Sequence, residues 1–250
     1  MYKEVKSIMK INFMGTSHGY AEKEQFTSAT LIEVSGYYYL LDAGAPVEWI
    51  LVNKDKPFDK IRGVFITHMH NDHVGNLTSV IEPMLRFRYN NNAVCFFPTE
   101  DGKNGFLDWM KVLNVSKDLV LSTVQLNVAK EGTIYEKDGL IVSAKYTKHI
   151  EKQSFSYVFE ADGKKVLFTG DMMGGFHEYP TLVGKEHYDL VVCEMAHAEI
   201  CDVKEMLRQT DTKRMIITHY FAPRIEGYEE IFKTFPFPVS LAKDGEEIIL

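Results

Sequence analysis

The sequence predicts an α/β fold in which two β-rich halves pack face to face with helices outside. Segments that alternate like half-buried strands recur along the chain, with helical patterns between them. The arrangement also repeats once. In each half one strand ends at an aspartate, Asp42 or Asp171, and a later strand ends at a histidine, His68 or His219. The polar side chains of both halves would then meet at one edge of the sandwich.

Length and composition fit a globular protein. A chain of 250 residues is long enough for one large domain or two small ones, and no linker rich in proline, glycine or serine divides it. With 45% hydrophobic and 25% charged residues, it can bury a sizeable core. We therefore expect a single domain over residues 1–250.

The net charge and the cysteine count indicate which classes of binding partner and which cellular compartment to expect. A net charge of −7 argues mildly against nucleic acid, although a local patch around Arg86 and Arg88 stays open. Three cysteines form no C-x-x-C pair, and their odd number argues against a disulfide framework. No stretch approaches the roughly 20 apolar residues of a membrane span. We expect a cytoplasmic protein that acts on a small molecule, with no membrane contact. A homodimer stays open.

In the first half, turn and helix signals separate the strands. Ser35-Gly36 joins two strands as a hairpin. Pro46 stands at the start of a helix, where proline is tolerated, and Pro83 would kink a second helix. Tyr89 to Asn92 form a turn cluster. The expected strands are 8–14, 28–34, 37–41, 62–67 and 93–97, and the expected helices are 45–53 and 74–85. A further helix is indicated by the spacing of four residues expected in the core, Phe106, Trp109, Met110 and Leu113.

The second half continues the alternation. Asp162-Gly163 predicts a hairpin turn, and Asp244-Gly245 predicts another inside 239–250. Asp202 would cap a helix that runs to about residue 209. Residues 172–175 are expected to be flexible at the mouth of a cleft. The expected strands are 119–126, 140–146, 155–159, 166–168 and 188–193, and a last helix is expected at 226–232.

The stretch from Thr67 to His73 carries the functional signal. It directly follows a buried strand and places three histidines and one aspartate within six positions. His68 and His70 are two residues apart, so on an extended segment they point the same way and can chelate one ion. Asp72 and His73 would face a second ion if the chain turns there. Two adjacent ions can activate water and stabilise an in-line displacement. The alternative, polar residues crowded on a solvated turn, does not account for this spacing at a strand end.

The His68-x-His70-x-Asp72-His73 motif resembles the signature of the metallo-β-lactamase superfamily. The later parts of that signature follow in order, each beside a strand-like segment, as His149, Asp171 and His219. The resemblance implies a four-layer αββα sandwich and two divalent metal ions. It also implies that Asp42 supports the metal ligands from behind without binding an ion itself. The implied ligands of one ion are His68, His70 and His149, those of the other are Asp72, His73 and His219, and Asp171 bridges both.

Within the superfamily, the sequence is most similar to the ribonuclease Z-like branch. Phe13 to Ser17 resembles the first strand and Gly-Thr-Ser loop of that branch, and the segment from Thr218 resembles its final histidine segment. Two features differ. Only a hairpin fits between His149 and Asp171, so the tRNA-clasping arm of the branch is absent. Cys193 stands where the branch has a histidine directly before a glutamate.

The residues and the resemblance together predict metal-assisted hydrolysis. Asp72 would serve as ligand and proton acceptor, and His197 or His18 would protonate the leaving group. For His197 and His18 a solvated surface position is the alternative. Zinc is the default metal because five imidazoles and two carboxylates suit it, while manganese, iron or nickel could bind the same set.

Four functions stay open at this point. We expect first a phosphodiesterase that acts on a small phosphodiester or nucleotide. The same metal pair could instead hydrolyse a carboxyl ester, a thioester or a lactone. The other two are tRNA 3′-end processing and a metal-binding role without catalysis.

Overall fold

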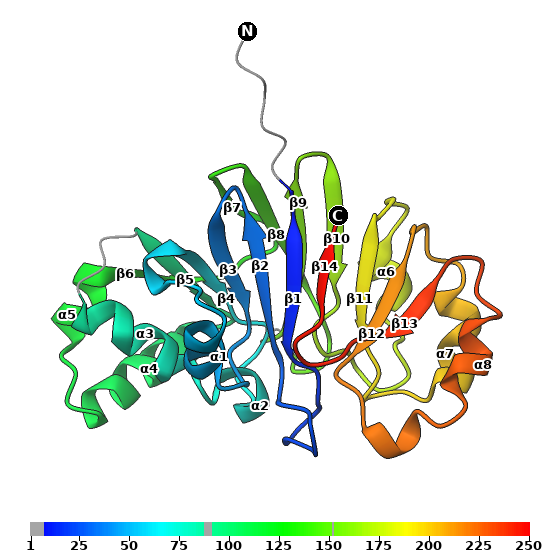
Figure 1. Ribbon diagram of the computed structural model, residues 1–250, viewed down its shortest axis with the longest axis horizontal. Coiled ribbons are helices and arrows are strands. Elements are labelled where there is room, and N and C mark those ends of the chain that lie inside the picture. Colours follow the sequence, from blue (N-terminus) through cyan, green and yellow to red (C-terminus); the bar gives the residue numbers. More distant parts are fainter. Residues whose placement is uncertain (1–7, 88–91, 152) are drawn as a thin grey trace, which may run out of the picture.

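The computed structural model describes residues 8–87, 92–151 and 153–250, and within them the chain forms two seven-stranded sheets with helices on the outside (Figure 1). The predicted αββα sandwich is therefore confirmed. The first sheet has the order β14-β1-β2-β3-β4-β5-β6 and comprises β1 (Lys10–Gly15), β2 (Ala29–Val34), β3 (Tyr37–Leu41), β4 (Ile61–Phe65), β5 (Ala93–Phe97), β6 (Val124–Val128) and β14 (Glu247–Ile249).

The second sheet has the order β13-β12-β11-β10-β9-β8-β7. It comprises β7 (Gly132–Lys137), β8 (Leu140–Tyr146), β9 (Phe155–Ala161), β10 (Lys164–Phe168), β11 (Leu190–Glu194), β12 (Met215–Thr218) and β13 (Val239–Leu241). Strands β3 to β6 are parallel, and so are β10 to β13. The carboxyl ends of such strands share one edge, where ligands commonly bind in α/β sheets.

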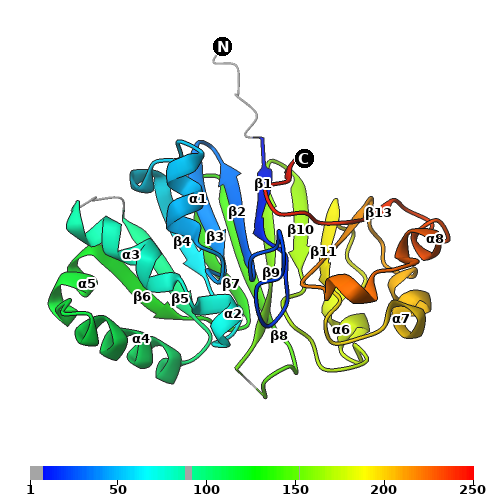
Figure 2. The ribbon, with the colours of Figure 1, turned by 60° about the horizontal axis from the view of Figure 1, so that its bottom comes forward.

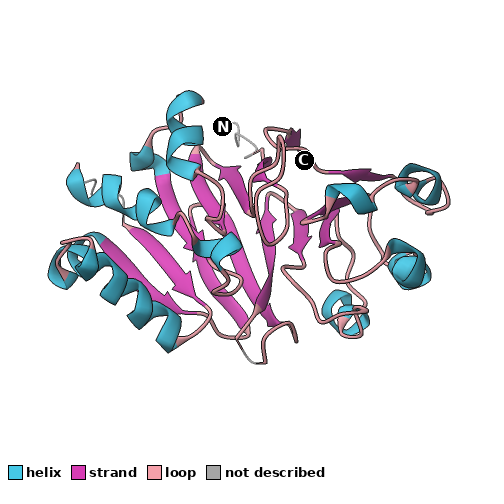
Figure 3. Cartoon of the chain, turned by 90° about the horizontal axis from the view of Figure 1, so that it is seen from below, coloured by secondary structure: helices cyan, strands magenta, loops and turns pink. Residues whose placement is uncertain are grey.

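Helices flank the outer faces of both sheets, as the view from below shows (Figure 3). The first group is α1 (Val47–Asn53), η1 (Phe58–Lys60), α2 (Asn71–Val74), α3 (Leu77–Arg86), α4 (Glu100–Val112) and α5 (Lys117–Thr123). The second group is α6 (Tyr179–Val183), α7 (Ile200–Leu207), η2 (Ala222–Arg224) and α8 (Tyr228–Phe232). Among the described residues, no helix is long and apolar enough to cross a membrane.

The core has three parts, one between the sheets and one under each group of helices. Phe65 of β4 shows how the central part is built. Its ring stacks on Phe96 at a centroid distance of 5.5 Å, and it meets Phe159 of the other sheet edge to face at 5.4 Å. Such aromatic pairs add to the stabilisation from burial alone. The inner faces of the two sheets therefore pack tightly against each other next to the edge where the parallel strands end.

Two strand predictions are wrong. Residues 119–126 are not one strand, because Ser116 caps α5 by accepting a hydrogen bond from the Leu119 amide, and β6 begins only at Val124. Residues 239–250 do turn at Asp244-Gly245 but form no hairpin. β13 pairs in parallel with β12 of the second sheet, and β14 pairs antiparallel with β1 of the first. The sequence signals did not indicate β7 or α6.

The predicted helices also need correction. The helix predicted at 74–85 is present as α3 but begins only at Leu77, because Val74 still belongs to α2 and the Asn76 amide between the two helices donates to the Ala43 carbonyl at 2.8 Å. Asp202 does not cap α7, which begins two residues earlier at the buried Ile200. In α4, Met110 is buried as expected, but Trp109 is 54% exposed, so it is not a core residue. Leu113, the residue after α4, is 41% exposed and lies outside the core as well.

The flexible segment expected at 172–175 is held in place instead. Met172 is buried, and its amide and that of Met173 each donate to a buried glutamate. The predictions that concern Arg88 and residues 89–91 lie outside the described part of the chain.

Candidate metal centre

The stretch from Thr67 to His73 follows β4 at one end of the sandwich and runs into α2 (Figure 2). The backbone is extended at His70, with φ −66° and ψ 149°, and then makes the single turn of α2. After this change of direction, His68 and His70 share one group of candidate ligand atoms and Asp72 and His73 share another, and the ring centroids of His68 and His73 are 4.0 Å apart. The turn on which the second set of ligands depends is therefore present.

The first group of side chains is His68, His70 and His149. The Nδ1 atom of His70 lies 2.9 Å from Nε2 of His68 and 3.2 Å from Nε2 of His149. His68 comes from the end of β4 and His149 from the loop after β8, so the two sheets meet in this group. All three ligand atoms lie within 4.8 Å of one another.

The second group is Asp72, His73 and His219. Nε2 of His73 and Nε2 of His219 are 3.3 Å apart. Oδ2 of Asp72 lies 3.4 Å from Nε2 of His73 and 3.2 Å from Nε2 of His219. All three residues are buried. A tetrahedral ion with ligand bonds of 2.0–2.1 Å separates its ligands by about 3.3 Å. The spacing in this group therefore fits a metal ion.

Asp171 lies between the two groups. Its Oδ2 is 3.7 Å from Nε2 of His68, 3.8 Å from Nε2 of His149 and 3.5 Å from Nε2 of His73. Its Oδ1 is 3.6 Å from Nδ1 of His219. A carboxylate in this position can contact ions on both sides.

The charges in the cluster suit cation binding. Burial and the neighbouring His73 lower the pKa of His68 to about 2, so this imidazole is neutral and free to act as a ligand. Burial alone would raise the pKa of Asp171. The charges of His219 and His73 outweigh that effect and keep its pKa well below the usual range. His68 is therefore a neutral imidazole and Asp171 an ionised carboxylate, which are the forms that bind metals. Burial alone would lower the pKa of His73, but the charges of Asp171 and Asp42 outweigh it and raise this pKa well above the usual value, so a bound ion would have to displace that proton.

Asp42 fixes the orientation of His73, one of the three residues of the second group. This residue follows β3 and is buried with φ +59°. Its Oδ1 accepts the Thr67 amide at 2.8 Å, and its Oδ2 accepts the Thr67 hydroxyl at 2.8 Å and lies 2.7 Å from Nδ1 of His73. Nε2 of His73 is therefore left to face the site. Such outer partners fix the ring orientation of a ligating histidine.

His197 lies beside the cluster, half-buried. Its Nδ1 is 2.9 Å from Oε1 of Glu194 and 4.0 Å from Oδ2 of Asp171, and its ring centroid is 4.6 Å from that of His149. Burial lowers the pKa of His197, but the hydrogen bond and charge of Glu194 outweigh it, so the net shift is upward. A pocket of about 300 Å³ borders His197 together with Ala196 and Arg224.

His18 lies farther out. Its ring centroid is 6.5 Å from that of His219 and 5.0 Å from that of Phe221, and its Nε2 is 3.5 Å from a carboxylate oxygen of Glu22. The structure thus gathers the seven predicted ligands, with His197 next to them and His18 at the rim. His177 and His187 are exposed.

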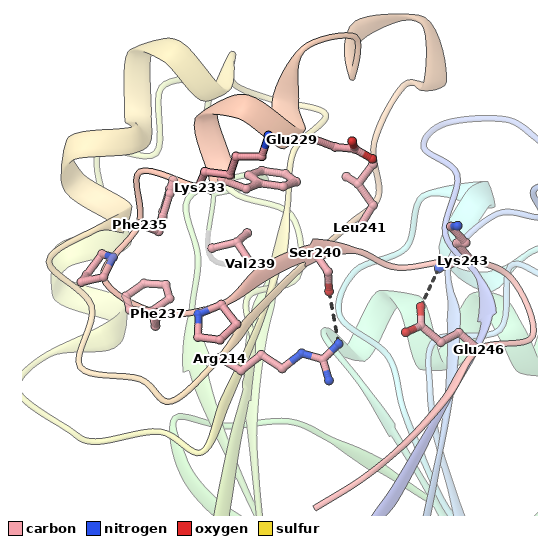
Figure 4. A pocket seen from close by; sticks show the side chains of 13 residues that line it. Arg214, Glu229, Lys233, Phe235, Phe237, Val239, Ser240, Leu241, Lys243 and Glu246 are labelled. Carbon is pink, nitrogen blue, oxygen red and sulfur yellow. Dashed lines mark hydrogen bonds between the residues drawn. The ribbon is translucent and has the colours of Figure 1, made fainter.

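Sequence reasoning missed one carboxylate near the cluster, Glu178. It had no signal because it lies in no motif and precedes a five-residue helix that the pattern did not indicate. A larger groove of about 740 Å³ runs along β13 and is drawn in Figure 4. Its walls include Arg214, Phe237 and Glu246, and none of the predicted site residues lines it.

A family model described as "Anti-Pycsar protein Apyc1" matches residues 9–237 of the chain. A curated Ribonuclease Z from Saccharolobus islandicus (strain M.14.25 / Kamchatka #1) is 36% identical over a 297-residue alignment, which covers 95% of this chain and 97% of that protein. Another, from Trichodesmium erythraeum (strain IMS101), is 27% identical over 144 residues, 56% of this chain and 43% of that protein.

Solved structures share the fold at low identity. The metallo-β-lactamase fold protein YhfI from Bacillus subtilis has a TM-score of 0.76 and 15% identity, covering 97% of this chain and 100% of that one. The short form of human tRNase Z, ELAC1, has a TM-score of 0.73 and 18% identity, covering 96% and 98%. A diphosphatase from the PhnP family has a TM-score of 0.72 and 14% identity, and the match covers 96% of this chain and 97% of that one. The chain therefore belongs to the Anti-Pycsar protein Apyc1 family, and it is a ribonuclease Z-like, metal-dependent hydrolase of the metallo-β-lactamase superfamily.

Proposed function

We propose that this protein is a binuclear phosphodiesterase that acts on a small phosphodiester or nucleotide. One observation carries the proposal: two groups of ligand atoms face each other with Asp171 between them. The phosphodiester class is supported by the curated relatives, which are named as ribonucleases.

The donor set fits two divalent ions. His68, His70 and His149 would hold one, Asp72, His73 and His219 the other, and Asp171 would contact both. Nitrogen and carboxylate ligands without thiolates suit zinc, and manganese or iron is compatible with them. Bound ions would supply an activated water and polarise the phosphoryl oxygen.

The side chains of the protein would supply the remaining chemistry, and Asp72 is considered first. Burial raises the pKa of Asp72, but the hydrogen bonds with His219 and His73 outweigh it and leave the pKa below its usual range. The carboxylate is therefore a good ligand and a weak proton acceptor. We accordingly assign Asp72 to metal binding first, and proton acceptance to it only as a secondary role.

We assign proton donation to the leaving group to His197. Its Nδ1 is bonded to Glu194, so Nε2 is the nitrogen left to carry the proton toward substrate. The raised pKa favours the protonated form of His197. Cys193 cannot take this role, because its thiol is fully buried and burial raises its pKa well above the usual range. His18 lies at the rim, where it is better placed to contact the rest of the substrate.

A small substrate fits better than a tRNA. Only the β9–β10 hairpin separates the loops that carry His149 and Asp171, so the clasping arm has no counterpart there. The net charge of −7 also disfavours a long polyanion.

The test is to purify the protein without chelator and measure its metal content by elemental analysis. Turnover of bis(p-nitrophenyl) phosphate is then compared with that of a lactone and aryl-ester panel and of a precursor tRNA, each in zinc, manganese and iron. We expect about two metals per chain and diester hydrolysis. His187→Ala, on the exposed surface, serves as the matched histidine control. Ester or lactone turnover without diester turnover would replace the proposal, and failure to bind metal after reconstitution would refute the metal centre.

A further inference from the structure

Glu178 connects two loops that each carry a candidate ligand. Its Oε1 accepts hydrogen bonds from the Lys148 amide at 3.1 Å and from the Met173 amide at 2.8 Å. Lys148 directly precedes His149, and Met173 follows Asp171 by two residues. One carboxylate oxygen therefore joins the His149 loop to the Asp171 loop.

The strand order explains why such a connection is needed. The two loops leave β8 and β10, and β9 lies between these strands in the sheet. Two strands that have a third strand between them are two interstrand spacings apart, about 9.5 Å. Yet Nε2 of His149 and Oδ2 of Asp171 are only 3.8 Å apart. The loops must lean toward each other across the end of β9, and Glu178 holds them together at their bases.

The side chain is costly to bury, which points to a specific role. Glu178 is 5% exposed, and its Oε2 is buried without a hydrogen-bond partner. Among the described residues, no lysine, arginine or histidine forms an ion pair with it. A buried carboxylate without a cation costs free energy unless its hydrogen bonds offset that cost. The two amide hydrogen bonds offset part of that cost, and the positions they fix are those of the two loops.

A second glutamate holds the same segment from the other side. Oε1 of Glu194 accepts the Met172 amide at 2.8 Å. The two amides after Asp171 are thus each bound by a buried carboxylate, Glu194 from the end of β11 and Glu178 from the residue before α6. Only Glu178 also reaches the His149 loop.

We propose that Glu178 is a positioning residue that sets the separation of His149 from Asp171 and thereby the affinity of the site for metal. This inference rests on the proposed metal centre. The role depends on the reach of the side chain as well as on its charge, because the oxygen must contact two loops at once. An aspartate keeps the charge but shortens the side chain by one methylene group.

The experiment measures zinc affinity by competition with a chromophoric chelator in the wild type and in Glu178→Asp, Glu178→Gln and Glu178→Ala. We expect Glu178→Asp and Glu178→Ala to weaken the binding of at least one ion by about 10- to 100-fold, as loss of an outer partner of a metal ligand typically does. Glu178→Gln keeps an accepting oxygen and should lose less. The control is Glu186→Gln, which removes a carboxylate that bonds Lys145 and Lys165 away from the site.

The melting temperature of each variant in excess chelator separates a general loss of stability from a loss of affinity. Wild-type zinc affinity in both Glu178→Asp and Glu178→Ala would overturn the inference. Wild-type affinity in Glu178→Asp with a loss in Glu178→Gln would also overturn it, because charge rather than reach would then matter. If Glu178→Ala does not fold, the aspartate and glutamine variants decide. Failure of the wild type to bind zinc would instead refute the proposed metal centre.

Discussion

At the scale of single residues, His197 and Glu194 act as a pair. Nδ1 of His197 is bonded to the buried Glu194 carboxylate, and this contact outweighs the effect of burial on the pKa of His197. A histidine whose pKa is raised keeps its proton to higher pH and loses it as the pH rises through the raised value. If this proton goes to the leaving group, the rate should fall on the alkaline side.

We therefore predict that Glu194→Gln moves the alkaline limb of the pH–rate profile of kcat to lower pH. His197→Ala should remove that limb and lower kcat by about 10²–10⁴-fold for a diester with a poor leaving group. The loss should be smaller for p-nitrophenol, which needs little protonation. The measurement is kcat against pH for a series of aryl phosphodiesters. An equal loss for all leaving groups would argue against proton donation by His197.

The second residue-scale prediction concerns Asp72 and His73. We expect Asp72→Ala and His73→Ala to abolish turnover while the circular dichroism spectrum stays that of the folded protein, because each change would remove one of the four ligands proposed for an ion. Turnover assays with added zinc provide the measurement. Near-wild-type rates in both variants would contradict the assigned roles.

At the scale of elements, the turn between β13 and β14 holds the loop that follows β1. Oδ1 of Asp244 accepts the Thr16 hydroxyl at 2.7 Å, and its Oδ2 accepts the Phe26 amide at 2.6 Å. This loop also carries His18 at the rim of the site. A turn far along the sequence thus supports the first loop of the chain.

We predict that Asp244→Ala lowers the free energy of unfolding by about 1–3 kcal/mol, because the Thr16 and Phe26 donors lose their acceptor. Asp244→Asn should cost less, since its amide oxygen can still accept, and burial already raises the pKa of this carboxyl. Urea denaturation at neutral pH measures both variants. An alanine variant as stable as the wild type would show that the loop is held by other contacts.

The same turn shows what the sequence could predict and what it could not. Asp244-Gly245 indicated a change of direction, which is a local property of these two residues. Which strand each arm then pairs with depends on edges of the two sheets that lie far away in sequence. The four-residue helix α2 was equally hard to predict as a helix, although a turn of the chain at Asp72 and His73 was expected.

The gathering of the seven candidate ligands could be predicted because four of them share the closely spaced stretch from His68 to His73, and the family resemblance pointed to His149, Asp171 and His219. Glu178 was not, because its role arises only when the loops after β8 and β10 meet. Its place before a short helix carries no pattern of its own. The sequence therefore indicated the candidate ligands better than the residues that hold the loops behind them.

At the scale of the whole molecule, the candidate ligands join the two sheets. His70 and His73 belong to the first half, and His149, Asp171 and His219 to the second. An ion bound by both halves would stabilise only the folded state. The expected single domain over residues 1–250 stays a prediction.

We predict that saturating zinc raises the melting temperature and that chelator lowers it. At a free zinc concentration 100 times the dissociation constant, the added stability is about 2.7 kcal/mol. Differential scanning calorimetry with and without chelator measures this shift, and one cooperative transition in the same scans would support the single domain. Asp72→Ala should lose much of the zinc-dependent rise. A melting temperature that does not respond to zinc would contradict a site shared by the two halves.

The pairing of β14 with β1 has a consequence for folding. β1 consists of residues 10–15, yet its outer neighbour consists of residues 247–249, far away in the sequence. Until these two segments pair, the free backbone amides and carbonyls of β1 form an open sheet edge, which can pair with other partly folded chains. A variant that lacks residues 247–249 would keep that edge open, so we expect it to aggregate even though most of its core residues are present.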